Sequence, residues 1–380
     1  MVITTYGNGP RPIVTGGFQA FTTRDRLNTV KGNLAVVGLH FYSKERDPSS
    51  ADFDGSSNST RIRWLDDARN VLLEDCKMSF GGVNIIFQGD SGSPMTNIAI
   101  RRCIVVDAYT SGGHSQGVFA SSVDGLLIEE NVFDHNGWNE DVNGADRTIF
   151  NHNMYIQYTS KNVVVRGNIS ARGASHGLQL RPGGVAESNL FYRNALAMFA
   201  SNGSGGGQDN AAIVKDNVVM QSDDISESLP RGWGIEMKRI RNAAYIDNIV
   251  LNGAGTGGKA GIFASQNVIP DAPPVQVEGN IVQNWSNGSG DGLAVRESLI
   301  TEFALSGNIV DGVRRDTGEP VTFVDSTRDL DSYVQTLGQT GGFDKFIELN
   351  RNRARGEWLP ELAAQTFAEY MQQGFTVTTP

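Results

Sequence analysis

Two short segments of this sequence carry most of the side chains that could do chemistry together. Residues 151–157 read NHNMYIQ and residues 175–181 read SHGLQLR, so each segment has a histidine at its second position. A neutral imidazole can accept a proton near neutral pH, a phenol can donate one, and a guanidinium binds a carboxylate through two hydrogen bonds. A base, an acid and a carboxylate neutraliser are what β-elimination next to a carboxylate requires. The predicted catalytic residues are His152, Tyr155, His176 and Arg181.

Different interpretations of these residues stay open. The histidines could instead form a stacked ladder at a strand corner, and Arg181 could pair with Glu187 or Glu236. Strict alternation along a strand would point the histidines inward, although a corner can break the alternation. A metal site is a third interpretation, but the sequence has no HxH or HExxH spacing, so no metal ligands are predicted.

A second group of side chains is predicted to contact the substrate. Some lie at outward positions of aligned strands, and others lie in the longest insertion between repeats. Loops inserted on one side of a repeat protein commonly build its binding wall. His114 is included because it occupies the same place relative to its strand as His152 and His176. The predicted substrate-binding residues are His114, Trp138, Arg147, Gln157, Gln179, Glu236 and Lys238.

These segments belong to a repeat that runs through most of the chain. Its pattern is two to four apolar residues, a polar pair, Asn or Cys, and two apolar residues, as in LLIEENVF and VQVEGNIV. Asparagine suits such a column because it tolerates the left-handed conformation and its amide can bond to the asparagine of the next repeat. The column residues are Cys76, Cys103, Asn131, Asn168, Asn189, Asn217, Asn248, Asn280 and Asn308.

Each repeat is too short to be a domain and reads as strand, turn, strand. Such units bury an apolar face only by stacking on their neighbours, and parallel strands need a full circuit of chain between them. The sequence therefore predicts an all-β fold, a right-handed parallel β-helix over residues 1–325. A second strand in each repeat, aligned on Val118, Ile156 and Leu180, should point these residues inward and their neighbours outward.

The pattern changes after about residue 325. Three stretches, 330–337, 343–355 and 359–371, have apolar residues at the spacing of amphipathic helices. They predict a short C-terminal helical segment over residues 326–380 that packs on the side or the end of the β-helix. At the end, it would cover the last exposed strand edge.

Bulk properties narrow the class of protein. The chain has 45 glycines in 380 residues and only 19% charged residues, which favours strands and turns over helix bundles. The net charge of −10 argues against a nucleic-acid partner, and the absence of any run of 18 apolar residues argues against a membrane span. Cys76 and Cys103 are predicted to be free buried thiols, with a disulfide between neighbouring coils as the second possibility.

The asparagine-column coils, over roughly residues 30–320, resemble the pectate-lyase-like superfamily of right-handed parallel β-helix proteins. More narrowly, GLQLRPGG at residues 177–184, followed by ESNLF at 187–191, is similar to a strand of alginate lyases of polysaccharide lyase family 6. In that family an arginine in this context acts as the catalytic acid, a role that the resemblance assigns to Arg181. The resemblance implies a secreted or periplasmic protein, although no signal peptide is visible. It adds Ca²⁺ as the one cofactor to consider.

The residues and the resemblance together predict a polysaccharide lyase that acts by β-elimination on an acidic polysaccharide containing uronic acid. A glycoside hydrolase on the same fold would need two carboxyl groups about 5 to 10 Å apart, and the aligned strands carry no repeated aspartate pair. A C5-epimerase shares the proton abstraction, whereas a non-catalytic carbohydrate-binding β-helix needs no such chemistry. These three functions stay open beside the lyase.

Overall fold

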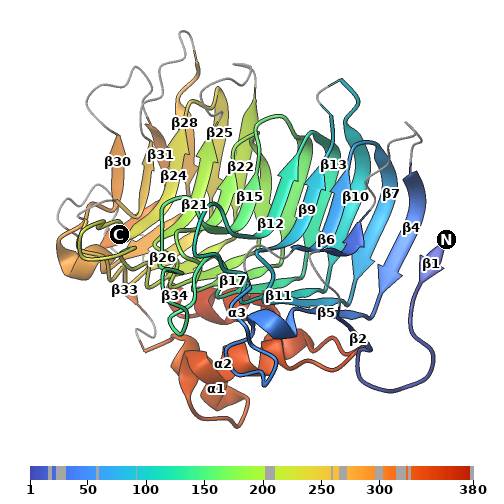
Figure 1. The fold of residues 1–380 in the computed structure, drawn as a ribbon. Coiled ribbons are helices and arrows are strands. Elements are labelled where there is room, and N and C mark those ends of the chain that lie inside the picture. The colour runs from blue at the N-terminus through green and yellow to red at the C-terminus, as the bar shows by residue number, and fades with distance from the viewer. Residues whose placement is uncertain are drawn as a thin grey trace.

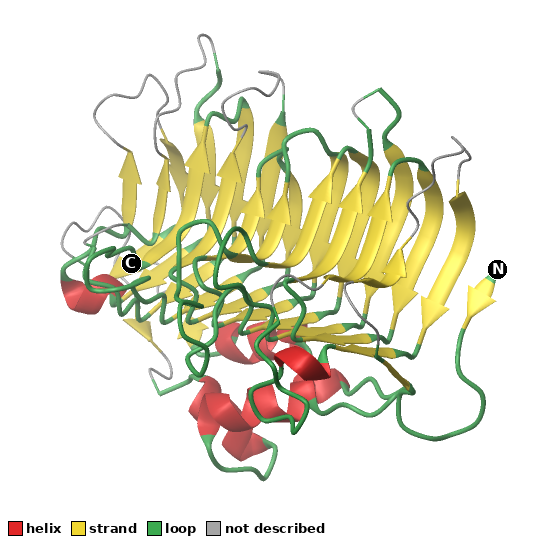
Figure 2. Cartoon of the chain, in the orientation of Figure 1, coloured by secondary structure: helices red, strands yellow, loops and turns green. Residues whose placement is uncertain are grey.

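Three long parallel sheets wind into a right-handed parallel β-helix (Figure 1). The structure is a computed structural model that describes residues 1–15, 19–22, 31–56, 60–90, 92–201, 210–257, 260–264, 272–295, 303–313, 322–323 and 327–376. Successive strands belong to sheets A, B and C in turn, so each coil contributes one strand to each sheet. Figure 2 shows the strands as the bulk of the molecule, with most of the helices gathered along one side. The predicted fold class is confirmed.

The strands of the three sheets have the following bounds. Sheet A contains β1 (Val2–Ile3), β4 (Lys31–Val37), β7 (Ala68–Glu74), β10 (Met95–Arg101), β13 (Val123–Glu129), β16 (Lys161–Arg166), β19 (Gly184–Glu187), β22 (Ala211–Lys215), β25 (Asn242–Ile246), β28 (Val275–Glu278) and β31 (Phe303–Ser306). Sheet B contains β2 (Ile13–Val14), β5 (His40–Tyr42), β8 (Lys77–Ser79), β11 (Ile104–Val106), β14 (Val132–Asp134), β17 (Ile169–Ala171), β20 (Leu190–Tyr192), β23 (Val218–Met220), β26 (Ile249–Leu251), β29 (Ile281–Gln283) and β32 (Ile309–Asp311). Sheet C contains β3 (Gln19–Thr22), β6 (Thr60–Leu65), β9 (Val83–Gln88), β12 (Gln116–Ser121), β15 (His152–Ile156), β18 (His176–Leu180), β21 (Leu196–Ser201), β24 (Trp233–Lys238), β27 (Ile262–Ala264) and β30 (Leu293–Val295).

The asparagine column lies at the turn from sheet A to sheet B and stacks inside the coils. Each side-chain amide donates to the side-chain oxygen of the asparagine on the next coil, at 2.9 Å from Asn131 to Asn168. The predicted ladder is confirmed, but the predicted left-handed conformation of its asparagines is wrong. The left-handed residue stands one position earlier, as at Glu130 (φ 57°) and Gly279 (φ 65°). The turn therefore bends before the asparagine, whose side chain is then free to point into the coil.

Replacing Asn217 by alanine should destabilise the coils. The Asn217 amide donates to Asn248 Oδ1 at 2.9 Å and to the Ala186 carbonyl at 3.0 Å, and its Oδ1 accepts from Asn189. Each buried group left without a partner costs about 1–3 kcal/mol, so we expect the free energy of unfolding to fall by about 3 kcal/mol in urea denaturation. Gln276→Ala, on the exposed face of sheet A, is the control and should stay within about 0.5 kcal/mol. Equal losses in the two variants would contradict the ladder's role.

The interior holds two further features of the turns. Cys76 and Cys103 are buried and are free thiols, as predicted. A second amide ladder, which was not predicted, lies at the turn from sheet B to sheet C. Its members are Asn84, Asn136, Asn153 and Asn194, all buried. Two corners of each central coil are thus held by stacked amides.

The C-terminal helices pack on the outer face of sheet B (Figure 1). They are α1 (Leu330–Thr336), α2 (Gly342–Arg351) and α3 (Ala364–Gln372), with a 3-10 turn at Pro360–Leu362 before α3. Two other 3-10 turns, Lys44–Arg46 and Trp285–Gly288, lie in the β-helix. The ring of Phe343 stacks on Tyr192 of β20 with centroids 4.0 Å apart. The helices therefore cover the side of the β-helix, while the predicted boundary at residue 325 lies outside the described residues. None of the described helices is long and apolar enough to cross a membrane.

Candidate functional site

The outer face of sheet C, here called the sheet C face, carries the predicted catalytic residues. The sequence alignment placed Ile156 and Leu180 opposite Val118, but the structure pairs Val118 with Met154 and Met154 with Leu178. The error is two residues, so the inward and outward assignments are unchanged. One outward row is Phe119, Tyr155, Gln179, Phe199, Glu236 and Phe263. The next row includes Ser121, Gln157, Arg181 and Lys238.

His152 and His176 lie on the sheet C face because side-chain alternation breaks at the corner. Asn153 and Met154 are consecutive, yet both point inward, Asn153 into the second amide ladder and Met154 into the apolar core. Two consecutive inward residues leave His152 outside, where its ring packs edge-on to Tyr155 with centroids 5.3 Å apart. The inward direction expected from strict alternation is wrong here, since the corner adds one residue to the inner side.

His114 does not share the column of the other two histidines. The structure pairs His152 with Gln116, and His114 stands two residues earlier on the exposed surface. Its ring lies edge-on to Phe150, with centroids 5.5 Å apart. The predicted alignment of three histidines is therefore wrong for His114.

His152 and His176 form a buried pair at the edge of this face. Their Nδ1 atoms are 3.1 Å apart, and Ser175 Oγ lies 2.8 Å from Nδ1 of His152 and 3.1 Å from Nδ1 of His176. The two residues are 2% and 5% exposed. Burial lowers the pKa of His176 to about 3, with Arg231 adding to the shift, and it lowers the pKa of His152 well below its ordinary value. Both imidazoles are therefore neutral at neutral pH.

Tyr155 and Arg181 make a short polar contact on the sheet C face. Arg181 Nη1 donates to the Tyr155 hydroxyl at 2.6 Å, and Gln157 Nε2 donates to the same oxygen at 3.3 Å. Because the hydroxyl accepts both bonds, its own hydrogen is available to another acceptor. The Arg181 guanidinium also lies over the ring of Tyr158, at 5.3 Å. A guanidinium has five N–H groups, and this one makes no other hydrogen bond within the described ranges, so it can bind a carboxylate.

Two loops, residues 138–151 and 222–232, pack together over the histidine end of the sheet C face. They meet in a small apolar cluster that includes Ile149 and Ile225, and Arg147 donates to Asp223 at 3.1 Å. The guanidinium of Arg147 lies 4.8 Å from the ring of Trp138. Trp138 in turn donates its indole N–H to a backbone carbonyl of the next coil. Trp138 and Arg147 thus shape these loops, and their contact with substrate stays a prediction.

The remaining predicted substrate-binding residues lie along the same two rows. Gln179 is half-buried between Tyr155 and Phe199. Glu236 is buried on the strand beyond Phe199, and Lys238 is half-buried two residues later on that strand. The structure therefore brings both sets of predicted residues onto one surface, except for His114, Trp138 and Arg147 at its margin.

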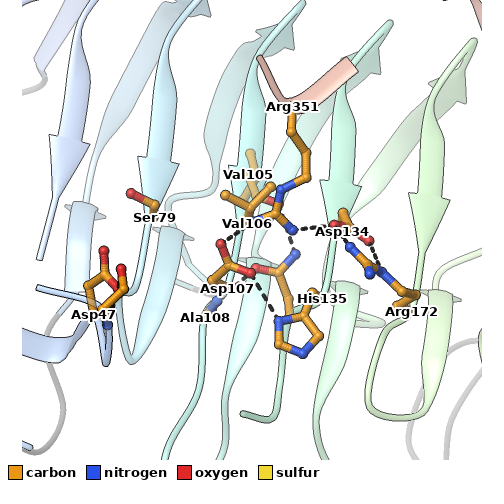
Figure 3. Close-up of polar contacts among 12 residues, drawn as sticks. Asp47, Ser79, Val105, Val106, Asp107, Ala108, Asp134, His135, Arg172 and Arg351 are labelled. Atoms are coloured by element: carbon orange, nitrogen blue, oxygen red, sulfur yellow. Dashed lines mark hydrogen bonds and ion pairs between the residues drawn. The ribbon is translucent and has the colours of Figure 1, made fainter. Parts of the chain in front are cut away.

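A second group of charged residues lies at the turn from sheet B to sheet C, and we call it the corner cluster (Figure 3). Asp107, His135 and Arg172 each follow a strand of sheet B in the left-handed conformation. Arg172 binds Asp134 through two hydrogen bonds, at 2.9 and 2.6 Å. Arg351, from the end of α2, donates to both Asp107 and Asp134. His135 Nδ1 lies 2.9 Å from Asp107 Oδ1.

The charges of the corner cluster balance one another. Its cations are His135, Arg172 and Arg351, and its anions are Asp107, Asp134 and Glu140, whose Oε2 lies 2.8 Å from His135 Nε2. A pocket of about 310 Å³ opens beside them. Because every one of these charges already has a partner, the arrangement is suited to fastening α2 onto the β-helix rather than to proton transfer.

The corner cluster was not predicted, although the sequence carries one signal for it. Asp107, His135 and Arg172 each lie four positions after a member of the asparagine column. They therefore form a second column that the same repeat could have located. Nothing in the local sequence points to Arg351, because it lies more than 200 residues away and only the packing of α2 brings it to the cluster.

His135 should make the free energy of unfolding fall as the pH rises above neutral. Burial by itself lowers the pKa of His135, but its contacts with Asp107 and Glu140 outweigh burial and raise that pKa to about 9. Since the pKa in the unfolded chain is about 6.5, this stabilisation is complete below that pH and is lost as the pH rises through about 9. We expect the free energy of unfolding to fall by up to about 3 kcal/mol across this range, and His135→Gln should remove that dependence.

His176 contributes with the opposite sign. Its folded-state pKa of about 3 lies below the unfolded-state value, so its stabilisation is complete above about pH 6.5 and is lost as the pH falls. Urea unfolding from pH 4 to 10 should therefore give a curve with a maximum near neutral pH. His114→Gln, at an exposed histidine, is the control for the loss of a surface imidazole. A wild-type curve that is flat above pH 7 would contradict the role of His135.

The described residues offer little for a metal ion. No group of three or more His, Cys, Asp and Glu side chains is placed to hold one within the described ranges. Asp107 and Asp134 of the corner cluster are already bound by arginines. A role for Ca²⁺ stays a prediction.

The chain shares its fold with solved structures at low sequence identity. No protein-family model and no curated protein sequence matches it significantly. A mutant of the periplasmic alginate epimerase AlgG aligns over 73% of this chain and 70% of its own, with 12% identity and a TM-score of 0.50. The A-module of the Azotobacter vinelandii mannuronan C-5 epimerase AlgE4 aligns over 84% and 79%, with 13% identity and a TM-score of 0.46. At such identities the first likeness establishes the fold alone, and the second adds nothing to it.

Proposed function

We propose that the protein is a polysaccharide lyase that cleaves a uronic-acid-containing polymer by β-elimination. The observation that carries the proposal is the 2.6 Å contact between Arg181 Nη1 and the Tyr155 hydroxyl. It puts a fixed cation beside a phenol whose own hydrogen is free for donation. A uronate whose carboxylate binds Arg181 is thereby held next to Tyr155, whose ring also contacts the ring of His152.

Each of these groups has a role in the elimination. Nε2 of His152 takes the proton from the carbon next to the carboxylate, and the electron pair of that C–H bond forms the new carbon–carbon double bond. The glycosidic carbon–oxygen bond breaks, and the leaving oxygen takes the hydrogen of Tyr155. Arg181 stabilises the charge that grows on the carboxylate. Burial keeps His152 in its base form, and the arriving carboxylate opposes the burial shift of its pKa.

The rows of the sheet C face suggest how the polymer lies. Phe119 and Phe199, both half-buried, offer rings to the faces of sugars on either side of Tyr155. Arg181 and Lys238 are about two strand spacings, ~10 Å, apart along the next row, so both can meet carboxylates. The polymer then runs across the strands, parallel to the helix axis. Because such polymers lie outside the cytoplasm, we propose a secreted or periplasmic location.

A C5-epimerase is the second candidate, and a specific observation favours it. The sheet C face holds two separate proton carriers, the His152–His176 pair and Tyr155. If one removes the proton and the other returns one to the opposite face, the sugar is inverted and the chain stays intact. The fold shared with an alginate epimerase is compatible with this outcome.

One experiment separates these functions. The full chain is incubated in heavy water with alginate, pectate, glucuronan and glycosaminoglycans, and products are followed by ultraviolet absorbance, mass spectrometry and proton NMR. A lyase gives unsaturated, absorbing fragments, whereas an epimerase puts deuterium into polymer of unchanged length. Tyr155→Phe should abolish either reaction because it removes the hydrogen donor.

A glycoside hydrolase and a non-catalytic binding protein would each give a distinct result in the same experiment. Reducing ends without ultraviolet absorbance indicate a glycoside hydrolase. Polymer binding without any product, unchanged in Arg181→Ala and His176→Ala, indicates a non-catalytic carbohydrate-binding β-helix. If no acidic polymer gives either ultraviolet absorbance or deuterium incorporation, the proposal is overturned.

A further inference from the structure

The contact between the two buried histidines restricts where their protons lie. A neutral imidazole carries one N–H, on either Nδ1 or Nε2, and both rings are neutral at neutral pH because burial lowers their pKa values. The two Nδ1 atoms are 3.1 Å apart. A hydrogen bond between them requires that one Nδ1 is protonated and the other is not. His152 and His176 must therefore adopt opposite tautomers.

Ser175 decides which histidine carries the Nδ1 proton. Its hydroxyl is fully buried and lies 2.9 Å from the Asn151 carbonyl oxygen and 3.2 Å from that of Ile149. A carbonyl oxygen only accepts, so the single hydroxyl hydrogen goes to one of these two oxygens. The serine oxygen then acts as an acceptor toward the imidazoles. Its shorter contact is to Nδ1 of His152, at 2.8 Å against 3.1 Å for His176. A single Nδ1–H on His152 can be shared between Ser175 Oγ and the bare Nδ1 of His176 as a three-centre hydrogen bond.

We propose that Ser175 is a positioning residue that holds His152 as its Nδ1–H tautomer and His176 as its Nε2–H tautomer. Nε2 of His152 then carries a lone pair, and Nε2 of His176 carries a hydrogen. Neither Nε2 bonds to another described residue. The pair thus holds one basic and one acidic nitrogen without any net charge. The catalytic consequence, that His152 and not His176 is the base, rests on the proposed function, whereas the tautomers themselves do not.

The tautomers can be read without substrate. The full chain is labelled with ¹⁵N-histidine, and long-range ¹⁵N–¹H NMR spectra are recorded at neutral pH, with His152→Gln and His176→Gln used to assign the signals. In the wild type, Nδ1 of His152 and Nε2 of His176 should give the shifts of protonated nitrogens, and the other two nitrogens should give those of bare ones. The same tautomer at both histidines would overturn the proposal.

Ser175→Ala tests the role of the hydroxyl. Without this acceptor the preference for His152 as the donor is lost, so the four nitrogen shifts should move toward averaged values. Ser115→Ala is a matched control, because Ser115 occupies the same position two coils earlier, is equally buried and bonds to the Gly82 carbonyl instead. It should leave both tautomers unchanged. Tautomers that stay fixed in Ser175→Ala would also overturn the proposal.

Kinetics supply a second readout that loss of structure alone does not mimic. Because a competent tautomer is still populated in part, Ser175→Ala should lower kcat about two- to tenfold and leave KM unchanged. Opposite tautomers in a protein that transforms no polymer would leave this inference standing and defeat the proposed function. An active lyase in which both histidines have the same tautomer would defeat this inference and leave the proposed function standing.

Discussion

Arg181→Met is expected to lower kcat/KM on an acidic polysaccharide by about 100- to 1000-fold, as the loss of one preorganised charge-stabilising donor does in other enzymes. The guanidinium bonds to the Tyr155 hydroxyl, and its other N–H groups are those that we propose bind the sugar carboxylate. Its removal takes away the stabilisation of the developing negative charge and also the group that fixes Tyr155. The loss should appear mainly in kcat, measured as the initial rate of ultraviolet absorbance at several polymer concentrations.

Two further variants sharpen this result. Arg181→Lys keeps the positive charge but loses the planar two-point contact, so it should recover only a small part of the activity. Arg69→Met removes an exposed arginine from the outer face of sheet A and should retain wild-type kinetics. Activity of Arg181→Met within threefold of the wild type would show that the carboxylate is neutralised elsewhere.

The fold could be predicted because the repeat imposes the same physical demand on every coil. An asparagine at one corner is stabilising only when another asparagine stacks above it, and the ladder from Asn131 to Asn308 meets that condition. The helices could be predicted because apolar spacing is local. The place where these helices pack, on sheet B, could not be predicted. It depends on which sheet has an apolar outer face, and alternation alone does not say whether residues such as Ile169 and Tyr192 point inward or outward.

The residues of the candidate site could be predicted, but the alignment of their strands could not. Counting back from an apolar residue aligned His114 with His152, whereas the strand pairing aligns Gln116 with His152. The direction of His152 also depends on the corner, where both Asn153 and Met154 turn inward. Alternation holds within a strand and fails where the chain bends between strands. The functional residues next to corners are therefore the ones that pattern reasoning places least well.

The sheet C face and the corner cluster differ in how their charges are satisfied. Arg181 pairs with no carboxylate among the described residues, whereas the charge of Arg351 is divided between two carboxylates. An arginine without an acidic partner can bind an anionic ligand, whereas one whose charge is already neutralised is suited to holding the fold. The same residue type therefore supports function in one place and stability in the other, and the two roles should separate on mutation.

Arg351→Met should lower the free energy of unfolding by about 3–5 kcal/mol, the cost of breaking a buried ion pair on one side. Asp134 is fully buried, and Arg351 is one of its two cationic partners. Without it, the remaining charge of the cluster is negative in a place that water reaches poorly. Urea unfolding at pH 7 measures the loss, and limited proteolysis should show cleavage first near the C-terminal helices.

Two further variants serve as controls for this result, one on α2 and one in the corner cluster. Lys345→Met lies on the same helix and breaks only an exposed pair with Glu348 at 3.3 Å, so it should cost no more than about 0.5 kcal/mol. Asp134→Asn in the Arg351→Met background removes the uncompensated charge and should restore part of the stability. Equal losses of unfolding free energy in Arg351→Met and Lys345→Met would show that the corner cluster does not stabilise the packing of α2. At temperatures where Arg351→Met stays folded, its kcat/KM should equal that of the wild type, because the corner cluster shares no residue with the sheet C face.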